Sequence, residues 1–309
     1  MNLSLEEYLL TGFDEDVFMF WRNDKSVIVG KNQNTLSEIN SEYVNKNNIA
    51  VVRRLTGGGA VFHDMGNLNF SYIVRNEKNL YSDFDRFVAP IVSALHSYGL
   101  NAEYGGRNDI TIDGKKISGH AQAVYEDRLL HHGTLLFSAD LTALAAALNV
   151  NDSKILSKGI RSVRSRVTNI CEFKDISIEE FMEKIVKDEH VYDRSYLFTK
   201  QDINAINKLA CEKYRTWEWN YGYSPKYSFH NEKRFAGGSL EAYVDVKDGI
   251  IKNVKFYGDF LFRADIAEIE RALIGQKHIK NEALAVLGRF DLNEYFLNIT
   301  ADEVAQTLV

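Results

Sequence analysis

Residues 53–64 of the chain read RRLTGGGAVFHD, and this stretch guides the interpretation of the whole sequence. Three consecutive glycines separate two apolar, strand-like runs. Glycine costs backbone entropy and has no side chain to pack, so a triplet is favoured where the backbone must approach a ligand closely, most often a phosphate. The two arginines at the entrance of the stretch indicate that the ligand is an anion.

The alternative interpretation of the glycines is a turn that joins two strands of a large sheet. A glycine triplet alone supports both interpretations equally. Arg53 and Arg54 before the glycines, and His63 and Asp64 after them, favour the ligand site.

Length and composition limit the classes of protein to consider. At 309 residues the chain can form one large domain, or one large and one small domain. Its 45% hydrophobic and 26% charged residues are those of an ordinary soluble globular protein. The net charge of -6 argues against a general nucleic-acid binder or membrane-surface binder, although it allows local basic sites. We therefore expect neither nucleic acid nor membrane among its partners.

The expected compartment is the cytoplasm. No apolar run approaches the ~18 residues that span a membrane. Met1 is not followed by the basic and apolar segments of a secretory signal. The two cysteines, Cys171 and Cys211, make neither a disulfide framework nor a metal cluster.

The apolar periodicity predicts a mixed α/β fold, of the α+β class. Strands are expected at residues 17–21, 26–30, 49–54, 60–62, 67–74, 109–112, 116–118, 134–137, 239–246 and 250–257. Helices are expected at residues 3–10, 83–98, 141–148, 178–186, 201–214, 264–273 and 301–308. The first two strands are expected to pair across a turn at residues 22–25. Pro90 either kinks its helix or marks the start of that helix.

The clearest domain boundary lies near Pro225, after an aromatic run that begins at Trp217. The residues beyond it form a self-contained pattern of strands and helices that is long enough for a small domain. We expect one domain at residues 1–226 and a small α+β domain at residues 227–309.

A second segment that can carry chemistry is the hairpin of residues 108–119, which turns at Asp113-Gly114. Strand alternation predicts that Lys116 and Ser118 share one face of the hairpin, so that either Lys116 or its neighbour Lys115 points inward. A lysine beside an anion-binding loop can stabilise negative charge on phosphate and carboxylate oxygens. The alternative is a solvated hairpin lysine.

Three further features concern ions and charge. Asp109 could hold Mg²⁺ against bound phosphates, because this ion prefers oxygen ligands; the alternative is a turn cap.

His131 and His132 are adjacent in a strand, so they face opposite sides and are not expected to share a metal. Residues 154–169 are basic and contain no acidic residue, which predicts a flap over a nucleotide; the alternative is a solvated surface loop.

Several strings together resemble the lipoate–protein ligases, and the resemblance covers nearly the whole chain. They are RRLTGGGAVFHD at 53–64, GNLNFS at 66–71, NDI at 108–110, KISG at 116–119, HGTLL at 132–136, SVRSRVTN at 162–169 and WEWNYG at 217–222. Residues 235–260 resemble the accessory domain of that family, which makes residues 1–226 the catalytic domain.

The resemblance implies a fold shared with biotin–protein ligases and related to class II aminoacyl-tRNA synthetases. It also implies a two-step reaction. Lipoate and MgATP form lipoyl-AMP and pyrophosphate, and a lysine of an acceptor then attacks the mixed anhydride. The implied acceptors are the lipoyl domains of E2 subunits of 2-oxoacid dehydrogenases and the glycine-cleavage H protein. We expect the enzyme to act as a monomer.

The resemblance also assigns roles to residues. Lys116 is the implied catalytic residue, which bridges the lipoyl carbonyl and the adenylate phosphate. The implied contacts to ATP and lipoyl-AMP are Arg54, Gly57, Gly58, Gly59, Ala60, Val61, Phe62, His63, Asn108, Asp109, Lys116, His132, Gly133 and Thr134. The implied adenylate-covering loop contains Lys158, Arg161, Ser162, Val163 and Arg164. Trp21 is the expected wall of an apolar slot for the lipoyl chain, and Asp109 the expected Mg²⁺ ligand.

One feature departs from the family and two alternatives stay open. Members usually have a short strand before the first helix, so either the start of this chain is trimmed or its sheet lacks an edge strand. A transferase of the same superfamily would need a nucleophilic cysteine near the lysine, and there is none between Gly57 and Gly133. A protein that only binds lipoate or its adenylate would not need the set of Arg54, Asp109 and Lys116.

Overall fold

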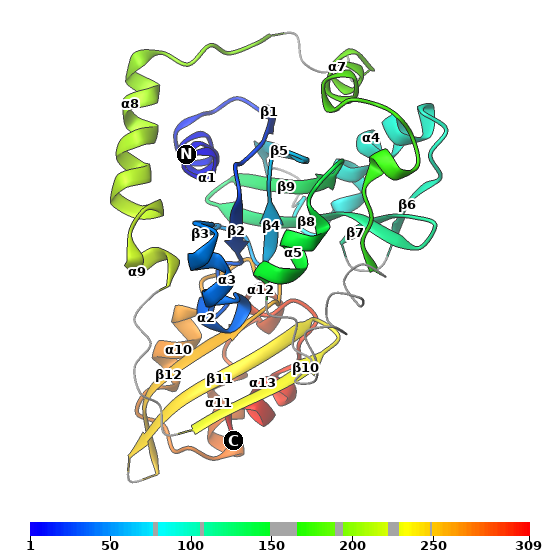
Figure 1. Cartoon of the computed structure of the whole chain (residues 1–309). Coiled ribbons are helices and arrows are strands. Elements are labelled where there is room, and N and C mark those ends of the chain that lie inside the picture. Colours follow the sequence, from blue (N-terminus) through cyan, green and yellow to red (C-terminus); the bar gives the residue numbers. More distant parts are fainter. Residues whose placement is uncertain (77–79, 106–107, 149–165, 189–193, 222–228, 248) are drawn as a thin grey trace.

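The computed structural model of the chain describes residues 1–76, 80–105, 108–148, 166–188, 194–221, 229–247 and 249–309. Helices and sheets are mixed throughout, as the sequence predicts, and a smaller sheet with its own helices forms the C-terminal part (Figure 1). No helix among the described residues is long and apolar enough to cross a membrane.

The largest sheet has six strands in the order β1-β5-β9-β8-β7-β6, and every neighbouring pair is antiparallel. The strands are β1 (Val17–Trp21), β5 (Asn67–Arg75), β6 (Ala102–Gly105), β7 (Asp109–Ile112), β8 (Lys115–Tyr125) and β9 (Arg128–Leu136). The hairpin of β7 and β8 is confirmed. Asp113 and Gly114 both have positive φ, as a two-residue hairpin turn requires.

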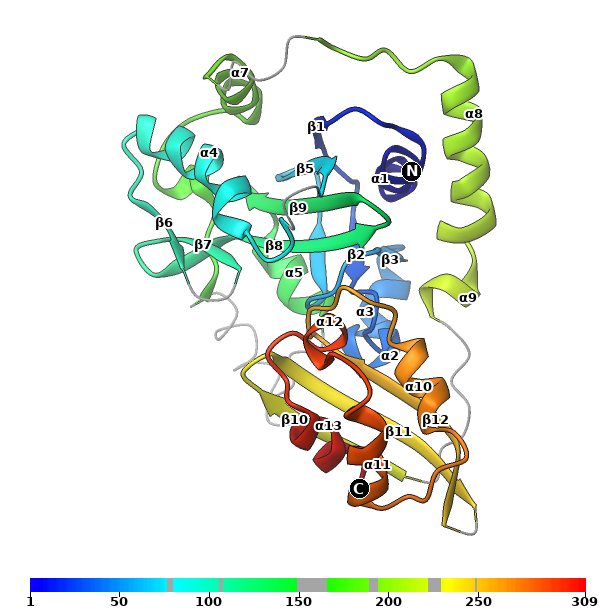
Figure 2. The ribbon, with the colours of Figure 1, turned by 180° about the vertical axis from the view of Figure 1, so that it is seen from behind.

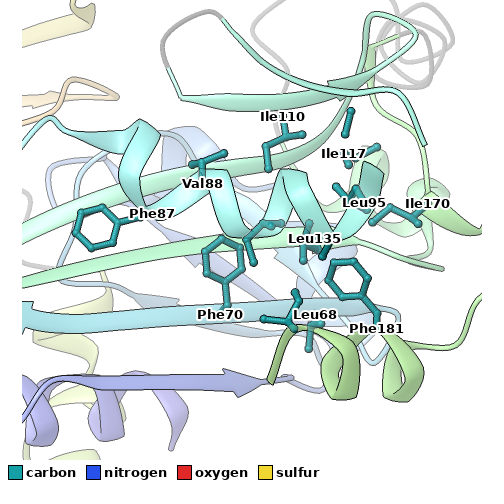
Figure 3. Packing of buried hydrophobic residues seen from close by; sticks show 14 of the residues in the cluster. Leu68, Phe70, Phe87, Val88, Leu95, Ile110, Ile117, Leu135, Ile170 and Phe181 are labelled. Atoms are coloured by element: carbon teal, nitrogen blue, oxygen red, sulfur yellow. The ribbon is translucent and has the colours of Figure 1, made fainter. Parts of the chain in front are cut away.

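One face of this sheet packs against α4 (Phe84–Ser97) and α7 (Ile178–Asp188). Phe87, Val88 and Leu95 of α4 and Phe181 of α7 meet apolar residues of the sheet in the main core (Figure 3). Helix α4 begins with Asp83 as its N-cap, so Pro90 lies inside the helix and does not mark its start.

The opposite face of the sheet is covered by α1 (Asn2–Gly12). Leu9 and Leu10 of this helix pack on Ile73 and Leu130 of β5 and β9. Helix α8 (Lys200–Leu209), with its one-turn π-helical extension η2 (Ala210–Tyr214), packs in turn against α1. Both views show α8 beside α1 (Figures 1 and 2).

A second, three-stranded sheet has the order β3-β2-β4, with β2 (Ser26–Val29) parallel to β3 (Ala50–Arg53) and antiparallel to β4 (Val61–His63). The predicted pairing of the first two strands is therefore wrong, because β1 pairs with β5 in the large sheet. All four residues of β2 are buried, which suits a central strand between two partners better than one arm of a hairpin.

Five short helices also belong to the N-terminal part, and α9 is the last of them. They are α2 (Thr35–Glu38), α3 (Ser41–Lys46), α5 (Leu141–Ala147), the 3₁₀-helix η1 (Ile170–Glu172) and α9 (Trp217–Asn220). Asp140 caps α5, as predicted. Asn220 of α9 accepts a hydrogen bond from Arg53 N (2.9 Å) and donates to the carbonyls of Tyr214 and Thr216. This buried amide ties the segment after α8 to β3.

The C-terminal part is a three-stranded antiparallel sheet of β10 (Phe229–Phe235), β11 (Gly238–Lys247) and β12 (Ile250–Gly258). Helices α10 (Ala267–Leu273), α11 (Lys280–Leu287), α12 (Leu292–Tyr295) and α13 (Ala301–Leu308) lie on one side of it (Figure 2). The sequence patterns did not predict β10, α11 or α12. The capping box of Thr300 and Glu303 at the start of α13 is confirmed.

The two parts touch through backbone and side-chain groups. Gly258 N–H donates to the Asn32 carbonyl (2.7 Å), and the Tyr81 hydroxyl donates to the Phe262 carbonyl (2.6 Å). The Lys31 ammonium lies 4.8 Å from the centre of the Phe262 ring. These contacts bring the C-terminal part against the loop that follows β2 and against the segment before α4.

Asn220→Ala should lower the free energy of unfolding by about 2–4 kcal/mol, because it removes three hydrogen bonds, two of them buried, and leaves Arg53 N–H without its acceptor. Urea denaturation measures the change. Asn47→Ala is the matched control, since its amide bonds on the surface and its loss should cost less than about 0.5 kcal/mol. Equal stabilities for the two variants would contradict this prediction.

Candidate active site

A cavity of about 130 Å³ lies where the two N-terminal sheets and α1 meet. The predicted site residues that line it are Trp21, Arg54, Gly58, Gly59, Ala60, Val61, His63, Asn108, Lys116, His132, Gly133 and Thr134. Residues that line it without having been predicted are Leu3, Ile28, Gly119, His120 and Ala121. The loop residues Lys158, Arg161, Ser162, Val163 and Arg164 lie outside the described residues.

Three predicted residues lie behind or beside this lining. Phe62 is 1% exposed and packs in the core of the small sheet. Gly57 contacts the C-terminal part, and Asp109 meets the ammonium of Lys116.

A β-bulge gives Lys116 its direction. Lys116 lies opposite Thr111, yet Ser118 lies opposite the adjacent residue Ile110, so β8 contains one extra residue at this point. The Lys116 ammonium lies on the side of Gly119, where a Cβ would be 2.9 Å from Nζ, whereas Ser118 is buried on the other side. The prediction that Lys116 and Ser118 share a face is wrong, because the bulge breaks the alternation of the strand.

Lys116 is paired at the mouth of the cavity. Its Nζ lies 2.7 Å from Oδ1 of Asp109, and the two side chains are 38% and 35% exposed. The carbonyl of Lys116 accepts a hydrogen bond from Thr168 N (3.0 Å), and Val167 forms a parallel bridge with Lys116. The chain that follows the predicted covering loop therefore passes directly beside this lysine.

The three glycines of the loop lie in three different environments. A Cβ on Gly57 would lie 2.6 Å from the Phe260 carbonyl of the C-terminal part. Gly58 has a φ of +86°, and its carbonyl would be 2.1 Å from a Cβ on Gly30. Only Gly59 has open space where a side chain would be. Packing or backbone conformation thus explains two glycines of the triplet, and Gly59 is the one that leaves open space beside the loop.

Arg54 holds this loop from inside. Its guanidinium donates to the carbonyls of Gly57 (2.6 Å), Gly59 (2.9 Å) and Ile28 (3.1 Å), and its Nε donates to Thr56 Oγ1 (2.9 Å). The residue is 6% exposed, and desolvation lowers the pKa of its guanidinium to about 10. Arg54 is still charged at neutral pH, and its hydrogen bonds to carbonyls hold the backbone of the glycine loop in place.

A chain of buried hydrogen bonds continues from Thr56 to the far wall of the cavity. Thr56 Oγ1 bonds with His132 Nε2 (2.7 Å), and His132 Nδ1 bonds with Glu6 Oε1 (2.9 Å). The Ser71 hydroxyl donates to Glu6 (2.6 Å) and accepts from the indole N–H of Trp21 (2.8 Å). Every polar group on this path has a partner, so the wall at Trp21 and the glycine loop are fixed to each other.

The path also balances charge. A carboxylate only accepts hydrogen bonds, so the proton between Glu6 and His132 resides on His132 Nδ1. The hydroxyl of Thr56 bonds with the other ring nitrogen and accepts from Arg54 Nε. The carboxylate of Glu6 is thereby connected to the guanidinium of Arg54 through His132 and Thr56. Sequence reasoning missed Glu6 and Ser71. The available signal was an acidic residue on the same helical stripe as Leu3 and Leu10.

Arg53 and Asp64 have structural roles. The Arg53 guanidinium donates to the carbonyls of Gly30, Lys31 and Gln33, and also to Trp219 and Asn220 of α9. The Asp64 carboxylate accepts from the N–H groups of Gly66 and Asp140. Of the two arginines, Arg54 lines the cavity, whereas Arg53 fastens α9 to the small sheet.

The two adjacent histidines face opposite sides of β9, as predicted. His132 faces the cavity, and His131 stacks on Phe87 of α4. His131 bonds with His120 (3.2 Å), and burial lowers the pKa of His120 to about 3. These rings are neutral, and no group of three or more metal-ligating side chains occurs in the part of the chain that the structure describes.

Sequence comparison places the chain in a family. The family described as "Lipoyl protein ligase A/B catalytic domain" matches residues 1–188, and the one described as "Bacterial lipoate protein ligase C-terminus" matches residues 224–308. This chain belongs to the lipoate–protein ligase family. It is accordingly an enzyme, a ligase, with the mixed α/β fold and C-terminal domain expected of such a ligase.

Individual relatives agree with this membership. The chain is 45% identical to lipoate–protein ligase 1 of Staphylococcus aureus over 100% of this chain and 96% of that protein. The structure of P. falciparum LipL1 in complex with lipoate has a TM-score of 0.78 at 28% identity, covering 94% of this chain and 91% of that one. A lipoate-protein ligase A bound with ATP has a TM-score of 0.64 at 33% identity, covering 71% and 92%.

Gly57→Ala should loosen the contact with the C-terminal part, because the new methyl group meets the Phe260 carbonyl. Amide hydrogen exchange at Gly258, whose N–H bonds with Asn32, reports this opening. A cost of about 1–3 kcal/mol predicts exchange faster by roughly 5- to 150-fold. Gly59→Ala, at the open position of the same ligase loop, should leave the exchange at Gly258 unchanged. Equal exchange in both variants would refute this division of roles.

Proposed function

We propose that this ligase joins lipoate to a lysine of an acceptor protein in two steps, through lipoyl-AMP made from lipoate and MgATP with release of pyrophosphate. The observation that carries the proposal is that Lys116, the glycine loop and Trp21 line one cavity. The relatives with bound lipoate and with bound ATP support both substrates.

The length of the cavity suits an acyl chain. Trp21 on β1 pairs with Asn69 on β5, Asn69 pairs with Thr134 on β9, and Gly119 of β8 donates to Thr134 Oγ1. Three strand spacings separate Trp21 from Gly119, a distance of about 14 Å. An extended medium-length acyl chain reaches across this distance, with its carboxyl group at Lys116.

The polar end is suited to adenylate formation. Joining a carboxylate to a phosphate brings two anions together, and the ammonium of Lys116 lowers the cost of that approach. The open side of Gly59, the backbone of residues 60–62 and the side chains of Asn108, His132 and Thr134 are the proposed contacts to ATP and lipoyl-AMP at this end. His63, beside Trp21, is a proposed contact to the lipoyl part of lipoyl-AMP. Residues 158–164 are the proposed cover that keeps water from the mixed anhydride.

Mg²⁺ fits the chemistry of this end, because it is usually bound by one or two carboxylates together with substrate phosphates. Asp109 supplies such a carboxylate and already lies against Lys116. When bound, the ion would neutralise phosphate charge. Asp109 would hold it, and Lys116 would then be released from the ion pair toward the substrate.

The remaining parts of the proposal concern partners and organisation. We propose lipoyl domains of E2 subunits and the glycine-cleavage H protein as acceptors, a cytoplasmic location and a monomeric enzyme. We also propose that the catalytic domain comprises residues 1–226 and the accessory domain residues 227–309.

Intact-mass measurement of an apo lipoyl domain after incubation with the enzyme, lipoate and MgATP tests the function directly. The expected result is a mass increase of one lipoyl group that requires ATP. Transfer from an acyl-carrier donor without ATP would favour the alternative, a transferase. Binding of lipoate without any modification of the acceptor would favour a pure binding protein.

Lys116→Ala should lower lipoyl-AMP formation by roughly 10²–10³-fold while the protein stays folded, because the charge that stabilises the joined anions is gone. Pyrophosphate release measures this step. Lys115→Ala is the matched control, since Lys115 is exposed and lies one residue earlier on the same strand. Near-normal release by the Lys116 variant would contradict the assignment.

Cys171→Ser and Cys211→Ser should leave ATP-dependent ligation intact. Both thiols are free, and neither residue lines the cavity as far as the structure describes the chain. Partial burial and the nearby Glu172 also raise the pKa of the Cys171 thiol, which lowers its fraction of reactive thiolate. Loss of activity in either folded variant would favour a thioester mechanism and overturn the ligase mechanism.

A further inference from the structure

His63 is a buried polar side chain that lines the cavity beside Trp21. It lies at the end of β4, lines the cavity and is 2% exposed. Its ring centre lies 5.8 Å from that of Trp21, and Leu3 and Ile28 line the same cavity. Its Nε2 is buried and has no hydrogen-bond partner among the described residues. A buried polar atom of this kind has an unmet need for a partner.

Two asparagines determine what that atom is. Asn2 Nδ2 donates both to the Arg22 carbonyl (2.8 Å) and to Asn23 Oδ1 (2.9 Å). The Arg22 carbonyl can only accept, so the atom of Asn2 that faces it is the amide nitrogen. The atom of Asn23 that accepts from this nitrogen must then be its oxygen, Oδ1. The other end of Asn23, Nδ2, faces His63 Nδ1 at 3.1 Å and donates to it.

The tautomer of His63 follows from this chain of bonds. Because Nδ1 accepts from Asn23, the single proton of the neutral ring resides on Nε2. Burial, with smaller contributions from Arg54 and His132, lowers the pKa of His63 to about 3, so the ring stays neutral at physiological pH. The atom without a partner is thus an N–H donor.

The position of this donor determines that it would face the end of the acyl chain that is remote from the carboxyl group. If the acyl carboxyl group lies at Lys116, the other end of the chain reaches Trp21, which is about 14 Å from Gly119 across the sheet. His63 lies beside Trp21. In lipoate that end is a dithiolane ring, whose sulfur atoms are weak hydrogen-bond acceptors. In octanoate it is a methyl group, which accepts nothing.

We propose that Asn2 and Asn23 hold His63 as the Nε2–H tautomer so that it donates to a dithiolane sulfur and makes the enzyme favour lipoate over octanoate. This inference rests on the proposed function. An alkyl chain leaves the buried donor without a partner, and sites of this kind discriminate against the analogue that lacks the acceptor. Asn2 and Asn23 are positioning residues, since they act through His63.

The first test compares kcat/KM for lipoate and for octanoate in the complete ligation reaction. His63→Phe removes the donor and should lower the lipoate-to-octanoate ratio by roughly five- to tenfold. His63→Gln should keep the ratio, because its amide oxygen can accept from Asn23 and its NH₂ can still donate into the cavity. Asn47→Ala, a surface variant, is the control and should keep the ratio. An unchanged ratio in His63→Phe overturns the proposal.

The second test does not depend on turnover. In protein labelled with ¹⁵N-histidine, the NMR signals of His63 should show a protonated Nε2 and a bare Nδ1, assigned by their loss in His63→Gln. Lipoate should shift the Nε2 signal, and octanoate should not. Asn23→Ala should give a mixture of both tautomers. A proton on Nδ1 in the unmodified enzyme, or equal shifts with both acids, refutes the proposal.

The two tests separate the two proposals. An enzyme that attaches neither acid to an acceptor would overturn the proposed function. The NMR titrations with lipoate and with octanoate, without ATP or acceptor, would still decide whether His63 meets a sulfur atom.

Discussion

The buried guanidinium of Arg54 is the constraint on which the site depends. A charge that is 6% exposed must be compensated and must use its hydrogen bonds, or it destabilises the fold. Arg54 meets this requirement by holding the carbonyls of Gly57 and Gly59, which bends the loop around it. The conformation of the glycine loop is therefore dictated by a side chain from inside the protein, before any ligand is bound.

The compensation of this charge ties distant parts of the chain together. Glu6 provides the opposite charge from the first helix, and His132 carries the connection across β9. The neighbouring residue, Arg53, likewise donates hydrogen bonds from its guanidinium to backbone carbonyls, here those of α9. Two adjacent arginines at the end of β3 thus organise the N-terminal helix, the central sheet and the end of the N-terminal part around one cavity.

The sequence predicted the hairpin with Lys116 and the glycine loop, because turn residues and strand periodicity are local signals. It could not predict the side that Lys116 faces, because the bulge depends on the register between two strands. The separate roles of the three glycines could not be predicted from the sequence either. Gly57 is required by a carbonyl of Phe260, some two hundred residues later in the chain, and no local pattern reports such a contact.

The distribution of charge along the cavity gives the substrate one orientation. Burial keeps His63 and His120 neutral, with pKa values of about 3. The charge of Arg54 is directed at backbone carbonyls and connected to Glu6, so Lys116 is the lining cation placed to meet an anion. A carboxylate placed at the Trp21 end would lose its hydration without gaining a cation, which is costly. Under the proposed function, we therefore expect the carboxylate of the acyl substrate to face Lys116, and the neutral end of the cavity to meet the other end of the chain.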